Sequence, residues 1–244
     1  KFENRKKVQT GQFYLLLTHP SKTLDRQSRF PYFRTREKTN RWAVSGFARP
    51  MRKPGPWFGR SNMVHVDEEE GMHYEGYCIR PPSEAASILL QVTIGCSHNR
   101  CAFCGTYRDK RFRIKEERII LSDILYAARH MRQTDRLFLM DGDALIIPQP
   151  RLVWILERIR EHLPWVKRIG AYANAKSIRR KSVEDLRRLR ENGLGILYYG
   201  VETGDDEIRT AIQKGSTAAT CIEMGRRVKE AGILLSATVL LGIG

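Results

Sequence analysis

The chain has 244 residues, with 43 Lys or Arg, 27 Asp or Glu and a formal net charge of +16. This length is enough for one α/β barrel, or for one core domain with an extension, and it excludes two large domains. The sequence has no run of about 18 apolar residues, and its Lys-rich start lacks the apolar stretch of a secretory signal. Neither a membrane span nor a signal peptide is therefore predicted.

The positive charge is concentrated in the first quarter of the chain. Residues 1–62 carry 15 Lys or Arg and 3 Asp or Glu, whereas residues 72–244 carry 28 and 20. Prolines interrupt the first segment, which shows no sustained helical or strand period. We predict a basic, disordered or non-domain extension over residues 1–71 and a folded domain over residues 72–244. A basic arm is able to bind nucleic acid, but the folded domain carries little of the excess charge, so nucleic acid is not the favoured partner and no membrane partner is expected.

A folded pattern starts at residue 88, where a β-branched and apolar run ends at Gly95. Similar runs recur along the chain, and amphipathic helical patterns lie between them. The predicted strands are 88–94, 137–140, 168–173, 195–199 and 233–241, and the predicted helices are 122–131, 150–162, 182–192 and 218–231. Strands that alternate with helices at this spacing predict a parallel sheet built from right-handed crossover units.

The ends of the helical patterns carry capping signals. Ser182 with Asp185 three residues later resembles a capping box, and Gly193 and Gly232 stand where C-terminal caps belong. The fifth predicted strand runs into the last residues of the chain. We therefore predict a partial (β/α) TIM-like barrel of about five strands, truncated at its C-terminal end, with an exposed sheet edge.

Three of the five cysteines, Cys96, Cys101 and Cys104, lie within nine residues, directly after the first predicted strand. Barrel and open-sheet enzymes place their active sites on the loops that follow parallel strands. Three neighbouring thiolates repel one another unless a cation neutralises them, so the pattern predicts a metal ion or cluster. Five cysteines do not fit a disulfide framework, and cluster thiolates need a reducing compartment, so we expect a cytoplasmic protein.

Zinc is the main competing metal, because cysteines two residues apart are typical of its sites and His98 could complete the ligands. A structural zinc site normally draws a second ligand pair from further along the chain. Cys78 and Cys221 are isolated and are interpreted as small buried hydrophobes, and His98 as a loop residue. By contrast, an iron-sulfur cluster on three thiolates leaves one iron open to bind a substrate or cofactor.

The cysteine loop resembles the cluster-binding loop of the radical S-adenosylmethionine (radical SAM) superfamily. In that family the cysteines are separated by three and then two residues, and an aromatic residue precedes the last one. Phe103 supplies the aromatic residue, whereas four residues separate Cys96 from Cys101, which is a variant spacing. The resemblance covers residues 74–244. It implies a [4Fe-4S] cluster on Cys96, Cys101 and Cys104, with S-adenosyl-L-methionine as a second cofactor.

The resemblance also implies cofactor contacts at the ends of later strands. Gly142 and Asp143 match a family segment of two glycines and a glutamate that holds the methionine amino group of S-adenosylmethionine. Glu202 stands where a family glutamate approaches the ribose or the methionine end, and Asn174 has the equivalent position after the third strand. Each residue also has a plain structural interpretation, as a turn former or a loop carboxylate.

A basic stretch follows the cysteine loop. Its cations would stabilise a reduced cluster, bind a phosphate or form a solvated loop face. They are Arg108, Lys110, Arg111 and Arg113.

The implied activity is that of a radical SAM enzyme. One electron from the reduced cluster would cleave S-adenosylmethionine to methionine and a 5′-deoxyadenosyl radical, which abstracts hydrogen from a small-molecule substrate. An electron donor such as a flavodoxin-like protein is the implied partner, and no residue is assigned to catalysis itself. The alternatives are a radical SAM enzyme that modifies RNA, with residues 1–62 as its binding arm, and a zinc-containing nucleic-acid-binding module.

Overall fold

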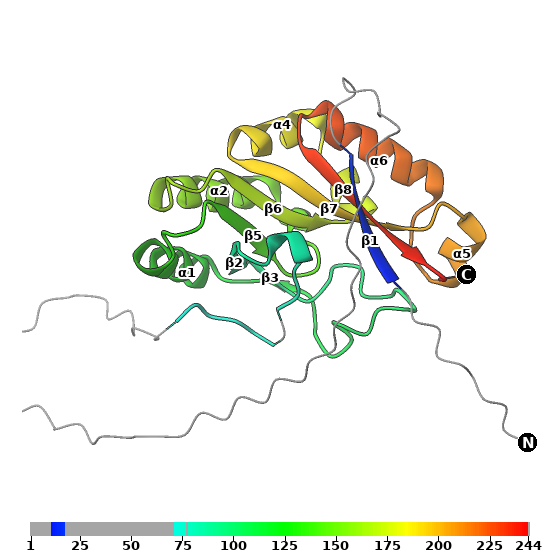
Figure 1. Cartoon of the computed structure of the whole chain (residues 1–244), viewed down its shortest axis with the longest axis horizontal. Coiled ribbons are helices and arrows are strands. Elements are labelled where there is room, and N and C mark those ends of the chain that lie inside the picture. Colours follow the sequence, from blue (N-terminus) through cyan, green and yellow to red (C-terminus); the bar gives the residue numbers. More distant parts are fainter. Residues whose placement is uncertain (1–10, 18–70, 77, 244) are drawn as a thin grey trace, which may run out of the picture. The chain divides into compact units, whose positions relative to one another are not determined.

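The computed structural model describes residues 11–17, 71–76 and 78–243, and its main element is a six-stranded sheet (Figure 1). The strands lie in the order β1-β8-β7-β6-β5-β2. Their bounds are Gly11–Leu17 (β1), Ile88–Gln91 (β2), Arg136–Met140 (β5), Arg168–Ala173 (β6), Leu194–Glu202 (β7) and Leu234–Leu241 (β8). The strands from β2 to β8 in this sheet are parallel, and neighbours along the chain are neighbours in space. This arrangement confirms the predicted partial α/β core, and the sheet of the described residues is open.

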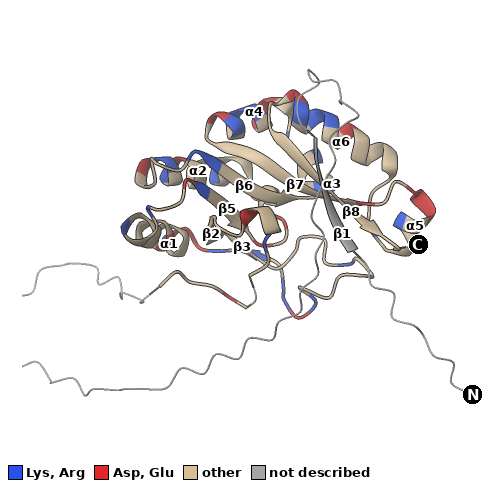
Figure 2. Cartoon of the chain, in the orientation of Figure 1, with Lys and Arg blue, Asp and Glu red and all other residues tan. Residues whose placement is uncertain are grey.

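Four longer helices connect the parallel strands and pack on one another in order, α1 on α2, α2 on α4 and α4 on α6. They are α1 (Glu117–His130), α2 (Gln149–His162), α4 (Val183–Glu191) and α6 (Ala218–Glu230). Their outer faces carry many of the charged residues (Figure 2), while their inner faces supply buried side chains such as Ile124, Leu156 and Val228. Among the described residues, no helix has the length and apolar composition to cross a membrane.

Both faces of the sheet are apolar, as is typical of buried parallel strands. Successive residues of a strand point to opposite faces. Leu137 and Leu139 of β5 therefore belong to the core beneath the helices, whereas Phe138 lies on the other face. There Phe138 makes edge-to-face contacts with two tyrosines. Its ring centroid lies 5.0 Å from that of Tyr172 and 5.7 Å from that of Tyr198. The inner surface of the partial barrel is therefore aromatic.

The predicted caps are confirmed. Ser182 Oγ accepts a hydrogen bond from Asp185 N at 2.9 Å, and Asp185 Oδ2 accepts one from Ser182 N at 3.0 Å. Gly193 and Gly232 follow the ends of α4 and α6 with φ angles of 100° and 75°. These angles lie in the left-handed region, where a glycine avoids the cost of a Cβ atom.

The first predicted strand, residues 88–94, is two strands in the structure. β2 ends at Gln91, and β3 (Thr93–Ile94) pairs with β4 (Arg113–Ile114) in a separate antiparallel ribbon. Val92 between them donates its N–H to Met140 O at 2.7 Å and accepts from Lys115 N at 3.0 Å. The apolar run continues from β2 into β3, so the periodicity of the sequence did not reveal that the two strands have different pairing partners.

The prediction of an exposed sheet edge at the fifth parallel strand is wrong. β1 pairs with β8 in antiparallel register, from Gly11 opposite Leu241 to Leu17 opposite Leu235. The apolar run of residues 13–17 contains no proline, which allows it to form a strand although no strand was predicted in this segment. The rest of the predicted basic extension lies outside the described residues, except for residue 71. The domain boundary at residue 71 stays a prediction.

Two short helices and two 3₁₀ turns lie near the strand ends. They are η1 (Pro82–Glu84), η2 (Ala144–Ile146), α3 (Ala175–Arg179) and α5 (Asp206–Ala211). η2, α3 and α5 follow the carboxyl ends of β5, β6 and β7, the edge at which parallel sheets hold their sites.

Candidate functional site

The three clustered cysteines lie on the loop that follows β3. All three are free and half-buried, and Cys104 N donates to Cys101 O at 3.2 Å. Arg108 holds the loop from outside, because its Nη2 donates to Cys101 O at 2.8 Å and its Nε to Cys104 O at 3.1 Å. Arg108 was predicted as a charge near the cluster, and the structure shows that it also fixes the loop backbone.

The thiols influence one another electrostatically. Burial raises the pKa of the Cys96 thiol, and Cys104 and the Asp143 carboxylate add to this rise. Burial also raises the pKa of Cys101, with further contributions from Cys96 and Cys104, whereas the Lys214 ammonium opposes it. Deprotonating these thiols together therefore needs a cation, and metal binding supplies one.

The loop does not have the geometry of a single-ion site. Within the described ranges, no three His, Cys, Asp or Glu side chains converge as the ligands of one metal ion would. Each thiolate of a [4Fe-4S] cluster binds a different iron atom, so a cluster does not require this convergence.

Asp141, at the end of β5, secures the start of the loop. Its Oδ1 accepts from Tyr107 Oη at 2.9 Å, and its Oδ2 accepts from Gly95 N and Gln91 Nε2, both at 3.2 Å. Burial raises the pKa of Asp141, and the Gly95 N–H opposes this rise. Burial and the Asp141 charge raise the pKa of Tyr107, which keeps its hydroxyl a donor. Neither the role of Asp141 nor that of Tyr107 was predicted from the sequence, because their partners are far apart along the chain.

Gly142 lies directly against the cysteine loop. A Cβ atom at this position would lie 2.7 Å from Tyr107 Cε2 and 3.0 Å from Cys96 Cβ. Both distances are shorter than ordinary van der Waals contact. Gly142 N also donates to Gly95 O at 3.2 Å. The residue is thus required by close packing against Cys96.

We expect Gly142→Ala to displace Tyr107 and the start of the cysteine loop. The added methyl group has no free space, so iron bound per chain after reconstitution should fall at least about twofold. Gly105→Ala is the matched control, because a Cβ there meets no atom within 4 Å. Equal iron content in the two variants would contradict the packing argument.

The predicted residues Asp143 and Asn174 contact each other. Asp143 is fully buried, and its Oδ2 accepts from Asn174 Nδ2 at 2.8 Å and from Ser97 Oγ, next to Cys96. Asn174 also caps α3, accepting from Ser177 N at 3.0 Å. The two residues therefore connect the ends of β5 and β6 to the cysteine loop.

Burial raises the pKa of Asp143 to about 6, and the hydrogen bond from Ser97 opposes this rise. The folded state then binds more protons than the unfolded state between pH 4 and pH 6. The resulting contribution to stability is present below pH 4 and is lost as the pH rises through 6.

We expect Asp143→Asn to remove this pH dependence, because an amide oxygen still accepts from Ser97 and Asn174. Relative to the parent, the free energy of unfolding of cluster-free D143N should rise by about 2 kcal/mol between pH 4 and pH 7. Urea denaturation at several pH values measures this difference. If the free energy of unfolding changed with pH in the same way for parent and variant, the pKa of Asp143 would not be raised in the folded state.

Lys214, which was not predicted as a site residue, contacts both Glu202 and Phe103. The Glu202 side chain is 8 % exposed, and its Oε1 accepts from Lys214 Nζ at 2.7 Å. Lys214 Nζ also lies 5.7 Å from the ring centroid of Phe103. Gly200 makes room for the ion pair, since a Cβ there would lie 2.5 Å from Glu202 Oε1. Glu202 Oε2 is buried and has no hydrogen-bond partner among the described residues.

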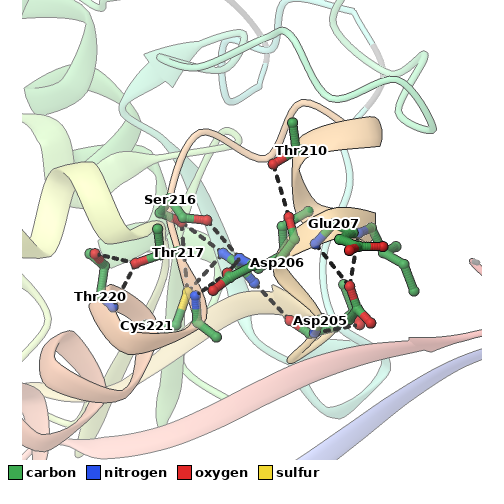
Figure 3. A network of polar contacts seen from close by, with 12 residues as sticks. Asp205, Asp206, Glu207, Thr210, Ser216, Thr217, Thr220 and Cys221 are labelled. Atoms are coloured by element: carbon green, nitrogen blue, oxygen red, sulfur yellow. Dashed lines mark hydrogen bonds and ion pairs between the residues drawn. The ribbon is translucent and has the colours of Figure 1, made fainter.

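Arg209 of α5 fixes the backbone on both sides of Glu202. It is 2 % exposed, and its Nη1 donates to Val201 O at 2.7 Å and to Thr203 O at 2.8 Å. Its other nitrogens donate to Ser216 O at 2.6 Å, Ser216 Oγ at 2.7 Å and Cys221 Sγ at 2.8 Å. Figure 3 shows Ser216 and Cys221 in this network beside the first turns of α5. Cys221 is buried, as predicted, and it is also hydrogen-bonded.

A family model for the radical SAM superfamily matches residues 90–244. The chain belongs to the radical SAM superfamily. No curated protein matches it significantly. Solved structures similar to this radical SAM chain include the cobalamin-dependent S-adenosylmethionine radical enzyme OxsB, at 20 % identity and a TM-score of 0.50. Another is the methyltransferase TsrM from Kitasatospora setae, at 18 % identity and a TM-score of 0.48. At these identities the likeness shows the fold alone.

The similar structures are much longer than the matched region. The match covers 62 % of this chain and 23 % of OxsB, and 61 % of this chain and 30 % of TsrM. Membership of the radical SAM superfamily implies a [4Fe-4S] cluster and S-adenosyl-L-methionine as the cofactors of this chain. The three free thiols on one loop fit the cluster, because they leave one iron without a cysteine.

The five residues predicted to contact the cofactors lie near the cysteine loop of this radical SAM core. Gly142 packs against it, Asp143 and Asn174 connect to it through Ser97, and Phe103 and Glu202 share Lys214. Their roles as cofactor contacts stay predictions.

Proposed function

We propose that this chain holds a [4Fe-4S] cluster on Cys96, Cys101 and Cys104 and acts as the core of a hydrogen-abstracting enzyme with a small-molecule substrate. When bound, the two cofactors would supply the one-electron reductive cleavage of S-adenosylmethionine that precedes hydrogen abstraction. The observation that carries the proposal is the position of three half-buried thiols on a loop that contacts Gly142 and Asp143, just past the carboxyl end of the parallel strand β5.

The protein's own residues would hold and orient these groups. Arg108 and Asp141 fix the two ends of the cysteine loop, so the three thiols are presented together. Glu202 Oε2, buried and without a donor among the described residues, would accept a hydrogen bond from a hydroxyl of the bound S-adenosylmethionine. Asp143 and Asn174 would bound the site on the side of β5 and β6.

The aromatic inner face would exclude water from the reacting atoms. Phe138, Tyr172 and Tyr198 cover this face of the sheet with edge-to-face ring contacts. Excluding water protects a reactive intermediate from side reactions. The proposal includes a reducing cytoplasmic compartment, in which an external one-electron donor such as a flavodoxin-like protein would reduce the cluster.

Anaerobic reconstitution with iron and sulfide tests the proposal. We expect about four irons per chain, the visible absorbance of a cluster, and formation of 5′-deoxyadenosine from S-adenosylmethionine under strong reductant. Elemental analysis of the purified protein separates iron from zinc. Stoichiometric zinc, without cluster absorbance after reconstitution, would contradict the proposal and favour the zinc-containing module.

A further inference from the structure

The residue that connects the Glu202 segment to the cysteine loop is Lys214, on the turn after α5. Its side chain is 12 % exposed, and the Glu202 side chain with which it pairs is 8 % exposed. Lysine is rarely buried to this extent unless it is paired. The Lys214 ammonium also lies 5.7 Å from the ring centroid of Phe103, which stands between Cys101 and Cys104 in the sequence. Its charge is therefore held beside the cluster loop.

The backbone around Lys214 is fixed against the same loop. Ile212 O accepts from Ala102 N at 2.9 Å, and Gln213 O accepts from His98 Nε2 at 2.7 Å. Gly215 has a φ angle of 75°, and a Cβ there would lie 2.7 Å from His98 Cε1. The position of Lys214 is thus determined by contacts with the cysteine loop itself, and His98 serves to hold this turn.

The turn that carries Lys214 contacts the residues that follow Cys101. Ala102 donates its N–H to Ile212 O at 2.9 Å, and the Lys214 ammonium lies 5.7 Å from the ring centroid of Phe103. A cation at this position stabilises negative charge on the neighbouring sulfur, because the Coulomb interaction is only weakly screened in a partly buried site. The same interaction would stabilise the extra electron of a reduced cluster.

We propose that Lys214 is a positioning residue of the cofactor site, whose ammonium holds Glu202 in place and offsets the lowering of the reduction potential that the Glu202 carboxylate alone would cause in the cluster bound at Cys101. The ammonium and the Glu202 carboxylate act in opposite directions, since the carboxylate disfavours added negative charge. In the unaltered pair these two effects largely cancel. This inference rests on the proposed function, because it requires the cluster.

Redox titration of the reconstituted 244-residue chain, followed by electron paramagnetic resonance, tests the inference. In Lys214→Met the carboxylate is left alone, so the ratio of reduced to oxidised cluster at a fixed potential should fall about tenfold, equivalent to 59 mV for one electron. Lys214→Arg should restore most of the parental ratio. Lys229→Met is the matched control, since it removes an exposed lysine on α6.

Glu202 provides the opposite test. Glu202→Gln leaves the ammonium alone and should raise the ratio of reduced to oxidised cluster, while the double variant K214M/E202Q should return close to the parent. The measurement on E202Q still tests the inference if K214M binds little cluster. Parental ratios in both K214M and E202Q would overturn the inference. A parent chain that forms no cluster would instead overturn the proposed function, so the two failures are distinguishable.

Discussion

Replacing Cys96, Cys101 or Cys104 with alanine is expected to abolish cluster binding and, with it, reductive cleavage of S-adenosylmethionine. Each thiol is one of three available on the loop, so a variant would retain only two protein ligands. Losing one thiolate leaves a second iron without a protein ligand, which weakens cluster binding. We expect bound iron and 5′-deoxyadenosine formation to fall at least about tenfold in each variant.

Cys78→Ala is the matched control for these variants. Cys78 packs against the apolar cluster around Phe138 on the inner face of the sheet. Losing its sulfur should leave the iron content unchanged, with a modest loss of stability of about 1 kcal/mol. Full iron content and cleavage activity in Cys96→Ala would refute the cluster assignment.

Lys115→Met is expected to destabilise the fold more than any surface substitution, by about 3–5 kcal/mol. Lys115 and Asp123 form an ion pair of 2.9 Å, and their side chains are 0 % and 3 % exposed. Lys115 Nζ also donates to His73 O at 2.6 Å, and Asp123 Oδ1 accepts from His73 N at 2.6 Å. Removing the ammonium leaves a buried carboxylate without its partner and frees the segment around His73.

Urea denaturation of the cluster-free protein measures this effect. The double variant Lys115→Met with Asp123→Leu should recover part of the loss, because replacing both charges leaves no unpaired buried ion. Lys167→Met is the matched control, since Lys167 pairs with Asp135 while 81 % exposed and should cost about 1 kcal/mol or less. A similar loss in the control and in K115M would show that burial of the Lys115 pair contributes little.

Much of the fold followed from local patterns. The alternation of apolar runs and amphipathic helices predicted the parallel core, and Ser182 with Asp185 predicted the start of α4. These signals are local, because strand and helix periods and caps depend on residues a few positions apart. The start of α1 was less visible. The predicted start at Ser122 lies inside a helix that begins at Glu117.

The partners of each strand were harder to predict. The continuous apolar run of residues 88–94 hid the division into β2 and β3, which depends on pairing with β4. β1 was missed because its pairing partner, β8, lies at the other end of the chain. Pairing between distant segments leaves no periodic signal in either one.

The sequence by itself identified Cys96, Cys101 and Cys104 as the chemical centre, because all three lie within nine residues of one loop. The tertiary structure alone showed what surrounds them. Tyr107 meets Asp141 across 34 positions, and Lys214 meets Glu202 across 12. Tyr107 and Asp141 meet because the segments after β3 and β5 pack together, and Glu202 and Lys214 meet because α5 returns the chain to the end of β7. The physical reason is that the cysteine ligands lie close together in the sequence, whereas the charges and hydrogen bonds that act on them come from residues further along the chain.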